Sequence, residues 1–521
     1  MKNGKKLFAL IAVIGFSITA CNSSPDVSSI DQMGSTTGGT SASGNVIFYP
    51  WPDEMPRFKG VTLKADGEII NLYSVMANIT HRWNENIQTA VGARIAIPVA
   101  MFDMAGDVDI EIGLPVNVEN AIVRPINSGI TPTVSGRIIT FTIPADKTNQ
   151  YSVEWNNNAI NPTNTILIFA NPHETFTGTI IVEPGVHVRD YFVSSGQTLY
   201  LKPGAVVRGS ISVNTGGKLV GRGIIDGSHR INWIKDCWRA VLPVVTSDAS
   251  NVEINGISIF DPNAWCMEIR NSSNVLISNV KIISSRCNSD GISIQSSNNV
   301  TIDKCFIRSW DDGVVIKNYS NTLNSHTITV KDTRLWTDLA QALEIGVETN
   351  KGQPGGCSRG PHALGAACTA PVNPDPKIYD VTFEDITVFH ALHKAPISIH
   401  NGDNAVITNI IFKDIVIENY QSGLGDGWNY LIDITNLTGR DMMGAPSWTH
   451  ITDRGSISGV HIENIHVLSG RRPGYRVRSS LGAQNSDVAG FIEISYKNIT
   501  YNGTEWNFTS NCPNSTVTKL Q

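Results

Sequence analysis

The strongest constraint on the fold is a short phrase that repeats through the second half of the chain. Val252, Val275 and Val300 hold the same place in SNVEINGISIF, SNVLISNVKII and NNVTIDKCFIR, at spacings of 23 and 25 residues. Further variants of the phrase continue to about residue 500. A period of this length indicates a solenoid with one coil per repeat. Because the phrases alternate apolar and polar residues without helical periodicity, they predict a parallel β-helix rather than a leucine-rich repeat or a large β-sandwich.

A different pattern precedes the repeats. Residues 45–172 contain short β-rich segments, such as VTLKADGEII, DVDIEIGLPV and GRIITFTIP, separated by Gly, Pro, Asn and Asp. Strands at this spacing are typical of a β-sandwich. We therefore predict an all-β chain, with a β-sandwich domain at residues 45–172 and a parallel β-helix domain at residues 173–521.

The N-terminus has the features of a secretion signal. Lys2, Lys5 and Lys6 precede an apolar run that ends in Ile-Thr-Ala and Cys21. The run is too short for a comfortable transmembrane helix, and a cysteine after small residues is similar to a bacterial lipoprotein signal. We predict a signal peptide at residues 1–21, a lipidated Cys21 and an anchored protein of the bacterial cell envelope, at the outer membrane or cell surface. Ordinary secretion is the alternative. Residues 22–44 lack patterned apolar residues and predict a flexible tether.

Composition narrows the classes of partner. The formal net charge of −6 over 521 residues implies no basic surface for nucleic acid. Of the eight cysteines, the seven beyond Cys21 lack paired C-x-x-C spacing, so a zinc site is not expected. Cys357 and Cys368 lie in one Gly/Pro-rich loop and are the best candidates for a disulfide in an oxidising compartment.

A second phrase repeats out of step with the first and carries the candidate chemistry. DGISI starts at Asp290 and DGVVI at Asp312, 22 residues later. Strands of consecutive coils lie about 4.8 Å apart. We therefore expect Asp290 and Asp312 to be neighbours, with Asp311 emerging from the same strand edge. Tight turns alone would explain either Asp-Gly pair. They would not explain Asp311, or the absence of acids at Trp265 and Gln341 in the flanking coils.

Three clustered carboxylates suit glycoside hydrolysis. Like charges at short range raise one pKa, so that one carboxylic acid stays protonated near neutrality. That acid donates a proton to the leaving oxygen, and another carboxylate activates water. Ca²⁺ held by the three acids is the alternative. We favour catalysis because sites for hard cations usually recruit more oxygens from one loop. No metal and no cofactor are predicted.

These residues resemble a known catalytic region. NSDG, with DD starting 21 residues after Asp290, is similar to the active site of glycoside hydrolase clan N, which groups the polygalacturonase-like family 28 and the dextranase-like family 49. The resemblance covers roughly residues 175–500 and implies a right-handed parallel β-helix and an inverting mechanism. It also implies that Asp311 is the general acid and that Asp290 and Asp312 hold the nucleophilic water.

Neighbouring coils separate the two families. Polygalacturonases carry Gly-His-Gly where this chain has Ala-Gln-Ala at residues 340–342, and Arg-Ile-Lys where it has Ser398, Ile399 and His400. A galacturonate polymer needs cations, ideally a bidentate Arg, so both differences favour a neutral sugar. DDGVVIKNYS and the preceding β-sandwich are similar to family 49, whereas the NSD at residues 288–290 is closer to family 28. A dextran-like glucan is the favoured substrate, and pectin is the alternative.

Five further residues are predicted to bind substrate: Lys317, Gln341, Glu344, Trp310 and His400. Trp310 would stack on a sugar ring next to Asp311. Four of them have a structural alternative. Lys317 and Glu344 would be solvated strand residues, Trp310 a core residue, and His400 a hydrogen-bonding partner of the backbone or, with neighbouring histidines, a metal ligand.

Together these features predict a lipid-anchored, two-domain glycoside hydrolase that cleaves internal α-linkages of a polysaccharide. The polysaccharide is the expected partner, membrane contact is expected only through the lipid, and the protein is expected to be a monomer. Two alternatives differ in class. One is a non-catalytic, glycan-binding β-helix at the cell surface. The other is a β-helical lyase, which would use an Arg or Lys base and commonly Ca²⁺.

Overall fold

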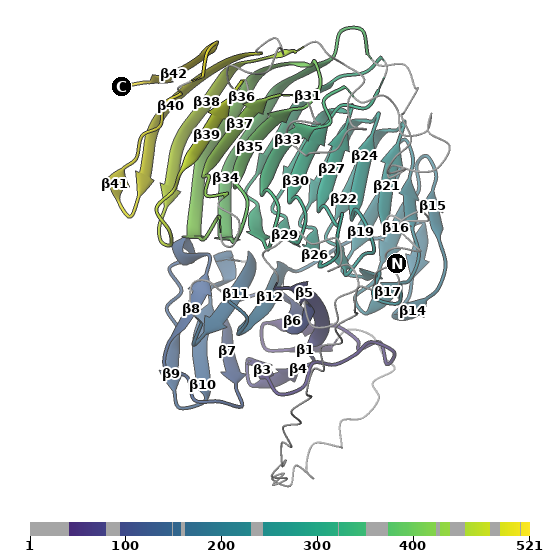
Figure 1. The fold of residues 1–521 in the computed structure, drawn as a ribbon. Coiled ribbons are helices and arrows are strands. Elements are labelled where there is room, and N and C mark those ends of the chain that lie inside the picture. Colours follow the sequence, from purple (N-terminus) through teal and green to yellow (C-terminus); the bar gives the residue numbers. More distant parts are fainter. Residues whose placement is uncertain are drawn as a thin grey trace, which may run out of the picture. The chain divides into compact units, whose positions relative to one another are not determined.

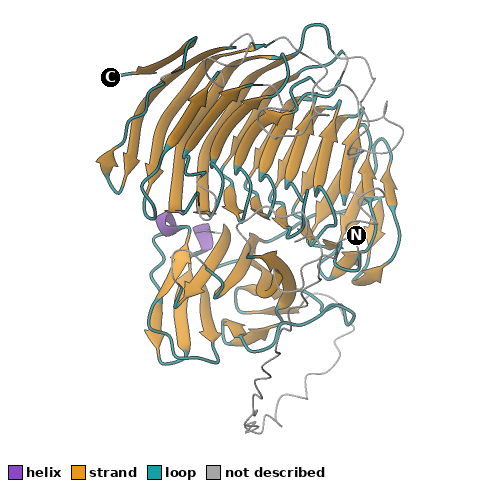
Figure 2. Ribbon diagram, in the orientation of Figure 1, coloured by secondary structure: helices purple, strands orange, loops and turns teal. Residues whose placement is uncertain are grey.

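The structure is a computed structural model that describes residues 41–79, 94–147, 149–157, 162–230, 243–320, 322–350, 373–423, 428–437, 454–479, 490–510 and 512–521. Regular structure in these residues is almost entirely β-strand (Figure 2), with short 3-10 helices at η2 (Ile126–Ser128) and η3 (Ala145–Lys147). Cys21, Cys357 and Cys368 lie outside the described residues, so the lipid anchor and the disulfide stay predictions.

Two sheets form a β-sandwich in the first part of the described chain (Figure 1). Buried side chains of both sheets, such as Phe102 and Ile168 from one and Ile110 and Phe141 from the other, form its core. The first sheet contains β1 (Ser41–Ser43), β2 (Val46–Phe48), β5 (Tyr73–Asn78), β6 (Arg94–Met104), β8 (Ala121–Arg124), β11 (Asn149–Trp155) and β12 (Thr165–Pro172). The second contains β3 (Thr62–Ala65), β4 (Glu68–Ile70), β7 (Val108–Gly113), β9 (Thr133–Ser135) and β10 (Ile138–Ile143).

The remaining strands wind into a parallel β-helix, in which each coil adds strands to two sheets. The ten-stranded sheet contains β15 (Tyr191–Val193), β18 (Ile211–Val213), β21 (Val244–Ser247), β24 (Met267–Arg270), β27 (Ile292–Gln295), β30 (Val314–Lys317), β33 (Leu343–Val347), β35 (Ile397–Asn401), β37 (Ile432–Asn436) and β39 (Tyr475–Arg478).

The other sheet, called the long sheet below, has 20 strands among the described residues. It contains β13 (Ile180–Val182), β14 (Gly185–His187), β16 (Thr198–Leu201), β17 (Ala205–Val207), β19 (Lys218–Gly221), β20 (Ile224–Asp226), β22 (Ser250–Asn255), β23 (Ser258–Phe260), β25 (Ser273–Ser278), β26 (Lys281–Ile283), β28 (Asn298–Asp303), β29 (Phe306–Ser309), β31 (Ser325–Lys331), β32 (Arg334–Thr337), β34 (Lys377–Ala391), β36 (Val406–Tyr420), β38 (Ser456–Val467), β40 (Phe491–Tyr501), β41 (Thr504–Glu505) and β42 (Ser515–Lys519). The predicted fold class, a parallel β-helix preceded by a β-sandwich, is confirmed.

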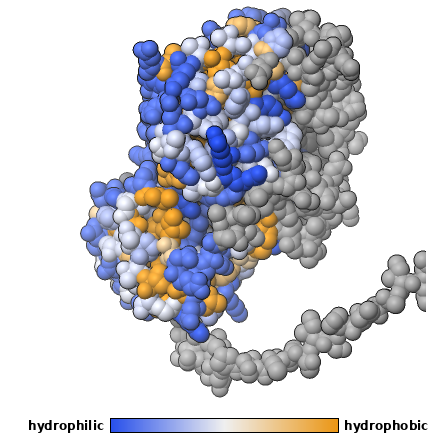
Figure 3. Space-filling model, turned by 60° about the vertical axis from the view of Figure 1, so that its left-hand side comes forward, coloured by the Kyte–Doolittle hydropathy of each residue, from blue (hydrophilic) through white to orange (hydrophobic). Residues whose placement is uncertain are grey.

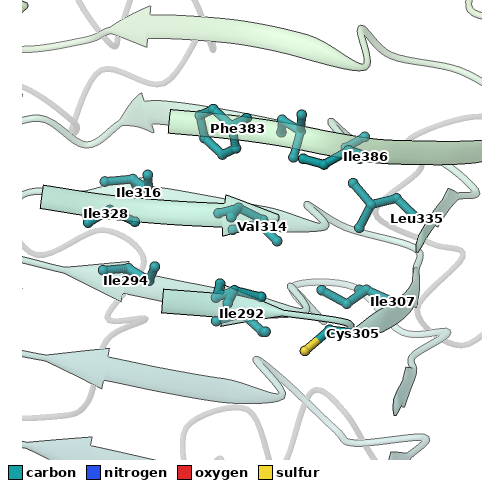
Figure 4. Close-up of a cluster of buried hydrophobic side chains, with 14 of the residues drawn as sticks. Ile292, Ile294, Cys305, Ile307, Val314, Ile316, Ile328, Leu335, Phe383 and Ile386 are labelled. Carbon is teal, nitrogen blue, oxygen red and sulfur yellow. The ribbon is translucent and has the colours of Figure 1, made fainter. Parts of the chain in front are cut away.

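The repeated phrase sets the register of the coils. Val252 pairs with Val275, and Val275 pairs with Val300, so equal places in successive phrases are direct neighbours. Alternate residues of each strand point inward and stack in columns of branched apolar side chains (Figure 4), such as Ile294 on Ile316. The interior is one continuous apolar cluster because successive coils contribute apolar side chains at equal places.

Asparagines explain how each coil turns. Asn251, Asn274 and Asn299 all have positive φ, between 50° and 58°, a conformation that Asn adopts more readily than most residues. The amide of Asn274 donates to Asn251 at 3.0 Å, and that of Asn299 donates to Asn274 at 2.6 Å. The Asn of the SNV phrase therefore both bends the coil and ties it to its neighbour.

The sandwich packs against the long sheet. Phe169 of the sandwich lies 5.3 Å from Phe306 of β29 between ring centroids, within one buried apolar cluster. The β-helix members of that cluster come from successive long-sheet strands: Val206, Ile224, Phe260, Ile283, Phe306, Trp336 and Phe389. A buried ion pair, Arg124 Nη1 to Glu418 Oε2 at 2.8 Å, extends the contact to β36. In this cluster the sandwich therefore packs against the long sheet, and no described residue of the ten-stranded sheet takes part.

The visible surface mixes hydrophilic and hydrophobic residues, and the hydrophobic ones gather most clearly on the sandwich (Figure 3). The exposed apolar side chains include Ile69 and Val116, which are 48% and 49% exposed. Single side chains of this kind are ordinary on a folded surface. No helix within the described residues has the length and apolarity needed to cross a membrane.

Candidate active site

Three carboxylates meet just before the N-terminal ends of β27 and β30, two neighbouring strands of the ten-stranded sheet. β27 and β30 pair in parallel with Ile292 opposite Val314, so Asp290 and Asp312 each stand two residues before a paired position. One oxygen from each of Asp290, Asp311 and Asp312 lies within 4.8 Å of the others. The 22-residue coil therefore brings the three acids into contact range.

The glycines after the aspartates permit this close stacking. A Cβ on Gly291 would lie 2.5 Å from the carbonyl oxygen of Gly313, and a Cβ on Gly313 would lie 2.6 Å from that of Ala342. Any larger residue would force the coils apart. The Asp-Gly repeat thus has a packing cause in its glycines, which leaves the aspartates to be explained by chemistry.

Hydrogen bonds hold each carboxylate in place. Asp311 accepts from the backbone N–H groups of Asn288 at 3.0 Å and Asp312 at 3.1 Å. Asp312 accepts from the backbone N–H of Gln341 at 3.2 Å. The Ser293 hydroxyl donates to Asp290 at 3.3 Å. Neighbouring coils therefore fix all three acids before any substrate arrives.

Burial raises the pKa of all three acids, and repulsion between carboxylates adds to this at Asp290 and Asp312. Burial and the charges of Asp311 and Glu348 raise the pKa of Asp290 to about 7, against the opposing Lys317. Burial, Asp311 and Asp290 raise that of Asp312 well above its usual value. The pKa of Asp311 is also raised by burial. The three groups titrate together, so the cluster retains a proton near neutrality. The choice of Asp311 as the acid rests on the resemblance and not on these shifts.

Lys317 is a buried counter-ion to the cluster. It is 5% exposed, and its Nζ lies 3.4 Å from Asp290 Oδ2 and 3.3 Å from Glu348 Oε2. The ammonium also lies 4.5 Å from the centroid of the Trp265 ring. It is therefore not a solvated strand lysine. A cation supplied by the chain already neutralises Asp290, so we assign no metal ion to the three carboxylates.

Comparison with known proteins agrees with this geometry. The family model described as glycosyl hydrolases family 28 matches residues 201–333, a span that includes all three acids. The chain is a glycoside hydrolase. No curated protein sequence matches it.

Two solved structures illustrate the likeness in fold. Dex49A from Penicillium minioluteum superposes with a TM-score of 0.51 at 14% identity, and the match covers 93% of this chain and 100% of that one. A family 28 exopolygalacturonase from Yersinia enterocolitica gives a TM-score of 0.42 at 11% identity, covering 79% of this chain and 96% of that one.

The side chain of Trp310 is buried and does not reach the protein surface. Its ring is 0% exposed and packs with Cys287 and Leu339. The prediction that Trp310 stacks on a sugar is therefore wrong, because no face of the indole reaches solvent. Its position next to Asp311 reflects packing behind the acid.

Gln341, Glu344 and His400 lie on the coils that follow the acids. Gln341 is mostly buried and contacts Asp312 through its backbone. Glu344 and His400 bond to each other, with Nδ1 of His400 2.8 Å from Oε1 of Glu344. Glu344 therefore does not face water. The role of these residues and of Lys317 in substrate binding stays a prediction.

Four charged residues near the site are not among the site residues predicted from the sequence: Glu348, Lys394, Asp433 and Arg476. Glu348 pairs with Lys317 at the end of β33. The charge of Lys394 opposes the rise in the pKa of Asp311 that burial causes. Asp433 and Arg476 continue the outward-facing column of the ten-stranded sheet beyond Ser398. The phrases LIDITN and YRVR carry that column in the sequence.

Asp290→Asn should stabilise the hydrolase increasingly as the pH rises. The pKa of Asp290 is raised to about 7 in the folded protein. Protonation of Asp290 therefore favours folding below its unfolded pKa, near 4, and this contribution is lost as the pH rises through 7. Asparagine has no such titration. Between pH 4 and 8, the variant should gain up to about 4 kcal/mol in unfolding free energy relative to the parent protein.

Urea denaturation at a series of pH values measures this gain. Asp248→Asn makes the same chemical change at an exposed turn and is the matched control. A difference between Asp290→Asn and the parent that stays constant from pH 4 to 8 would show that Asp290 titrates normally.

Proposed function

We propose that this glycoside hydrolase cleaves α-linkages of a neutral, dextran-like glucan by a single displacement that inverts the anomeric centre. The observation that carries the proposal is the cluster of three carboxylates, held within 4.8 Å by stacked coils and retaining a proton near neutrality. A partly protonated cluster supplies both the proton donor and the ionised base that glycoside hydrolysis needs.

Asp311 is proposed to protonate the leaving oxygen. It is partly exposed, and two backbone N–H groups orient its carboxyl. Asp290 and Asp312 are proposed to bind the attacking water and remove its proton. Lys317 supports the ionised form of Asp290 from the buried side. These roles follow the resemblance to clan N.

Charge pairing supports a neutral substrate. Among the described residues of the ten-stranded sheet near or beyond the acids, carboxylates hold three cations, and Arg478 of β39 is a further cation there. Lys317 is held by Asp290 and Glu348, His400 by Glu344 and Asp433, and Arg476 by Asp433. A uronate polymer requires a cation, ideally a bidentate Arg, for its own carboxylates. Arg476 already makes that kind of pair within the chain, with its Nε 2.7 Å from Asp433.

The fold likeness to Dex49A adds support for a family 49-like enzyme. The superposition covers nearly the whole chain and therefore includes the sandwich as well as the β-helix. A β-sandwich before the β-helix is the arrangement that the resemblance to family 49 implies.

A polygalacturonase-like pectin hydrolase is the second candidate. The family 28 match over residues 201–333 favours it. Lys394 also favours it, since its ammonium lies 5.8 Å from the Trp428 ring and its charge acts on Asp311. A uronate carboxylate would find a cation there.

The purified protein should release reducing ends from dextran, and Asp311→Asn should lower the rate by about 10²-fold or more, because it removes the proton donor. Incubation of both proteins with dextran and with polygalacturonate measures this. Release from polygalacturonate alone would select the pectin hydrolase. Binding of either polymer without release of sugar from the unmutated protein would favour the glycan-binding alternative. Asp248→Asn, at an exposed position directly after β21, controls for expression and folding.

The stereochemistry of the first product needs its own test. Inverting acid–base pairs usually stand about 6.5–9.5 Å apart and retaining pairs about 5–5.5 Å. The cluster here is tighter than the inverting range, and inversion is implied by the resemblance. Proton NMR within the first minutes of dextran hydrolysis should show the β-anomer ahead of mutarotation. An initial α-anomer would establish retention and a covalent intermediate.

We also propose that the mature protein is anchored to the cell envelope through a lipid on Cys21. The support is the basic, apolar and small-residue pattern of residues 1–21. Cells expressing the protein should incorporate labelled palmitate into it, and Cys21→Ser should abolish incorporation and release the protein from the membrane fraction. Label retained in Cys21→Ser would contradict the anchor.

A further inference from the structure

A chain of alternating charges runs along the ten-stranded sheet away from the acids. Glu344 Oε1 lies 2.8 Å from His400 Nδ1, and His400 Nε2 lies 3.1 Å from Asp433 Oδ2. Asp433 Oδ1 then accepts from Arg476 Nε at 2.7 Å. The order is therefore carboxylate, imidazole, carboxylate and guanidinium, over four consecutive strands from β33 to β39.

The strand register explains how His400 reaches both carboxylates. Glu344 pairs with Ser398, and Ser398 pairs with Asp433, so the two acids stand in one column, two coils apart. Two coil spacings amount to about 9.6 Å. Ser398 between them is small and leaves room for the ring of His400, which arrives from two residues further along β35. The Ser398 hydroxyl also donates to Glu344.

Each ring nitrogen of His400 lies close to a carboxylate oxygen, Nδ1 in a hydrogen bond and Nε2 at ion-pair distance, and this arrangement favours the imidazolium form. The ring is 6% exposed. Burial alone lowers the pKa of His400, but Glu344 and Asp433 outweigh burial and raise it to about 10. Asp433 is pushed the other way, since His400 and Arg476 lower its pKa despite burial. His400 and Asp433 thus stabilise each other's charged forms.

Glu344 connects this chain to the reaction centre. It pairs with Val315 of β30, the strand that directly follows Asp312. The charged groups that act on Asp312 are Asp311, Asp290 and Glu344, which raise its pKa, and Lys317, which lowers it. Glu344 is the one of these four that is itself held by His400.

We propose that His400 is a positioning residue that, with Asp433 and Arg476 behind it, holds the Glu344 carboxylate in place, balances its charge near Asp312 and so sets the lower pH limit of the reaction. His400 touches no reacting atom in this scheme and acts through Glu344. The inference rests on the proposed function, in which ionised Asp290 and Asp312 activate water. It replaces a direct role of His400 in sugar binding.

Two substitutions should move the pH–rate profile in opposite directions. His400→Gln removes a positive charge and leaves Glu344 unneutralised, so the acidic limb of kcat/KM should move to higher pH, by about half to one unit. Glu344→Gln removes the negative charge beside Asp312, so the same limb should move to lower pH by a similar amount. His400→Lys keeps the positive charge and should return the limb toward its original position.

His390→Gln is the matched control. His390 is also buried and also bonds to a glutamate, with its Nε2 2.8 Å from Glu154, but it stands at the sandwich contact. It should leave the limb in place. If His400→Gln and Glu344→Gln lower kcat without moving the limb, or move it in the same direction, His400 is a structural residue and the inference fails while the proposed function stands.

A measurement without turnover separates the two failures. In protein labelled with ring-¹³C histidine, the His400 signal, assigned by its loss in His400→Gln, should keep the imidazolium shift to pH 8.5. In protein labelled at the aspartate carboxyl carbon, the Asp312 signal should titrate at higher pH in His400→Gln than in the unmutated protein. A neutral His400 at pH 8, or an unmoved Asp312, would overturn the inference whatever the substrate is.

Discussion

In-register stacking of parallel coils is the interaction on which the rest of this protein depends. Each coil pairs with the next through backbone hydrogen bonds, as β27 does with β30 and β30 with β33. Side chains at equal places of successive coils are therefore neighbours, one strand spacing apart. Inside the solenoid this repetition gives columns of isoleucine and valine, and in the turns it gives a ladder of asparagines. On the outside of the solenoid the same stacking places Asp290 close to Asp311 and Asp312, and this cluster can carry out acid–base chemistry.

Putting like charges in contact is costly, and the structure offsets the cost locally. Lys317 forms an ion pair with Asp290, and the backbone N–H of Asn288 donates to Asp311. Farther from the cluster, Glu344 pairs with His400, and Asp433 pairs with Arg476. The repulsion that remains between the three acids keeps a proton on the cluster, and a retained proton is what hydrolysis of a glycosidic bond requires. The surrounding ion pairs tune the site and leave few cations to attract an acidic polymer.

Much of this could be predicted from the sequence, but only where the coils have regular length. Between Val252 and Val300 the period barely changes, so the neighbours of Asp290 follow from counting. Beyond β33 the coils are unequal: Leu343 pairs with Ile397, 54 residues later, and Ile432 pairs with Tyr475, 43 residues later. Counting then fails, which is why the partners of Glu344 and His400 were not foreseen. Trp310 was misplaced for another reason. It stands at a corner between strands, where alternation does not say which way a side chain points.

The contact between the sandwich and the long sheet has a consequence for how the solenoid can vary. The buried cluster touches successive coils from Val206 to Phe389, and this span brackets the coils that carry the three acids. The sandwich therefore contacts a fixed number of coils at matching positions. Gaining or losing a whole winding inside this span would break the alignment of many contacts at once. Coils after Phe389 contribute no described residue to this buried cluster, so changes in coil length should be better tolerated toward the C-terminal end, away from the acids.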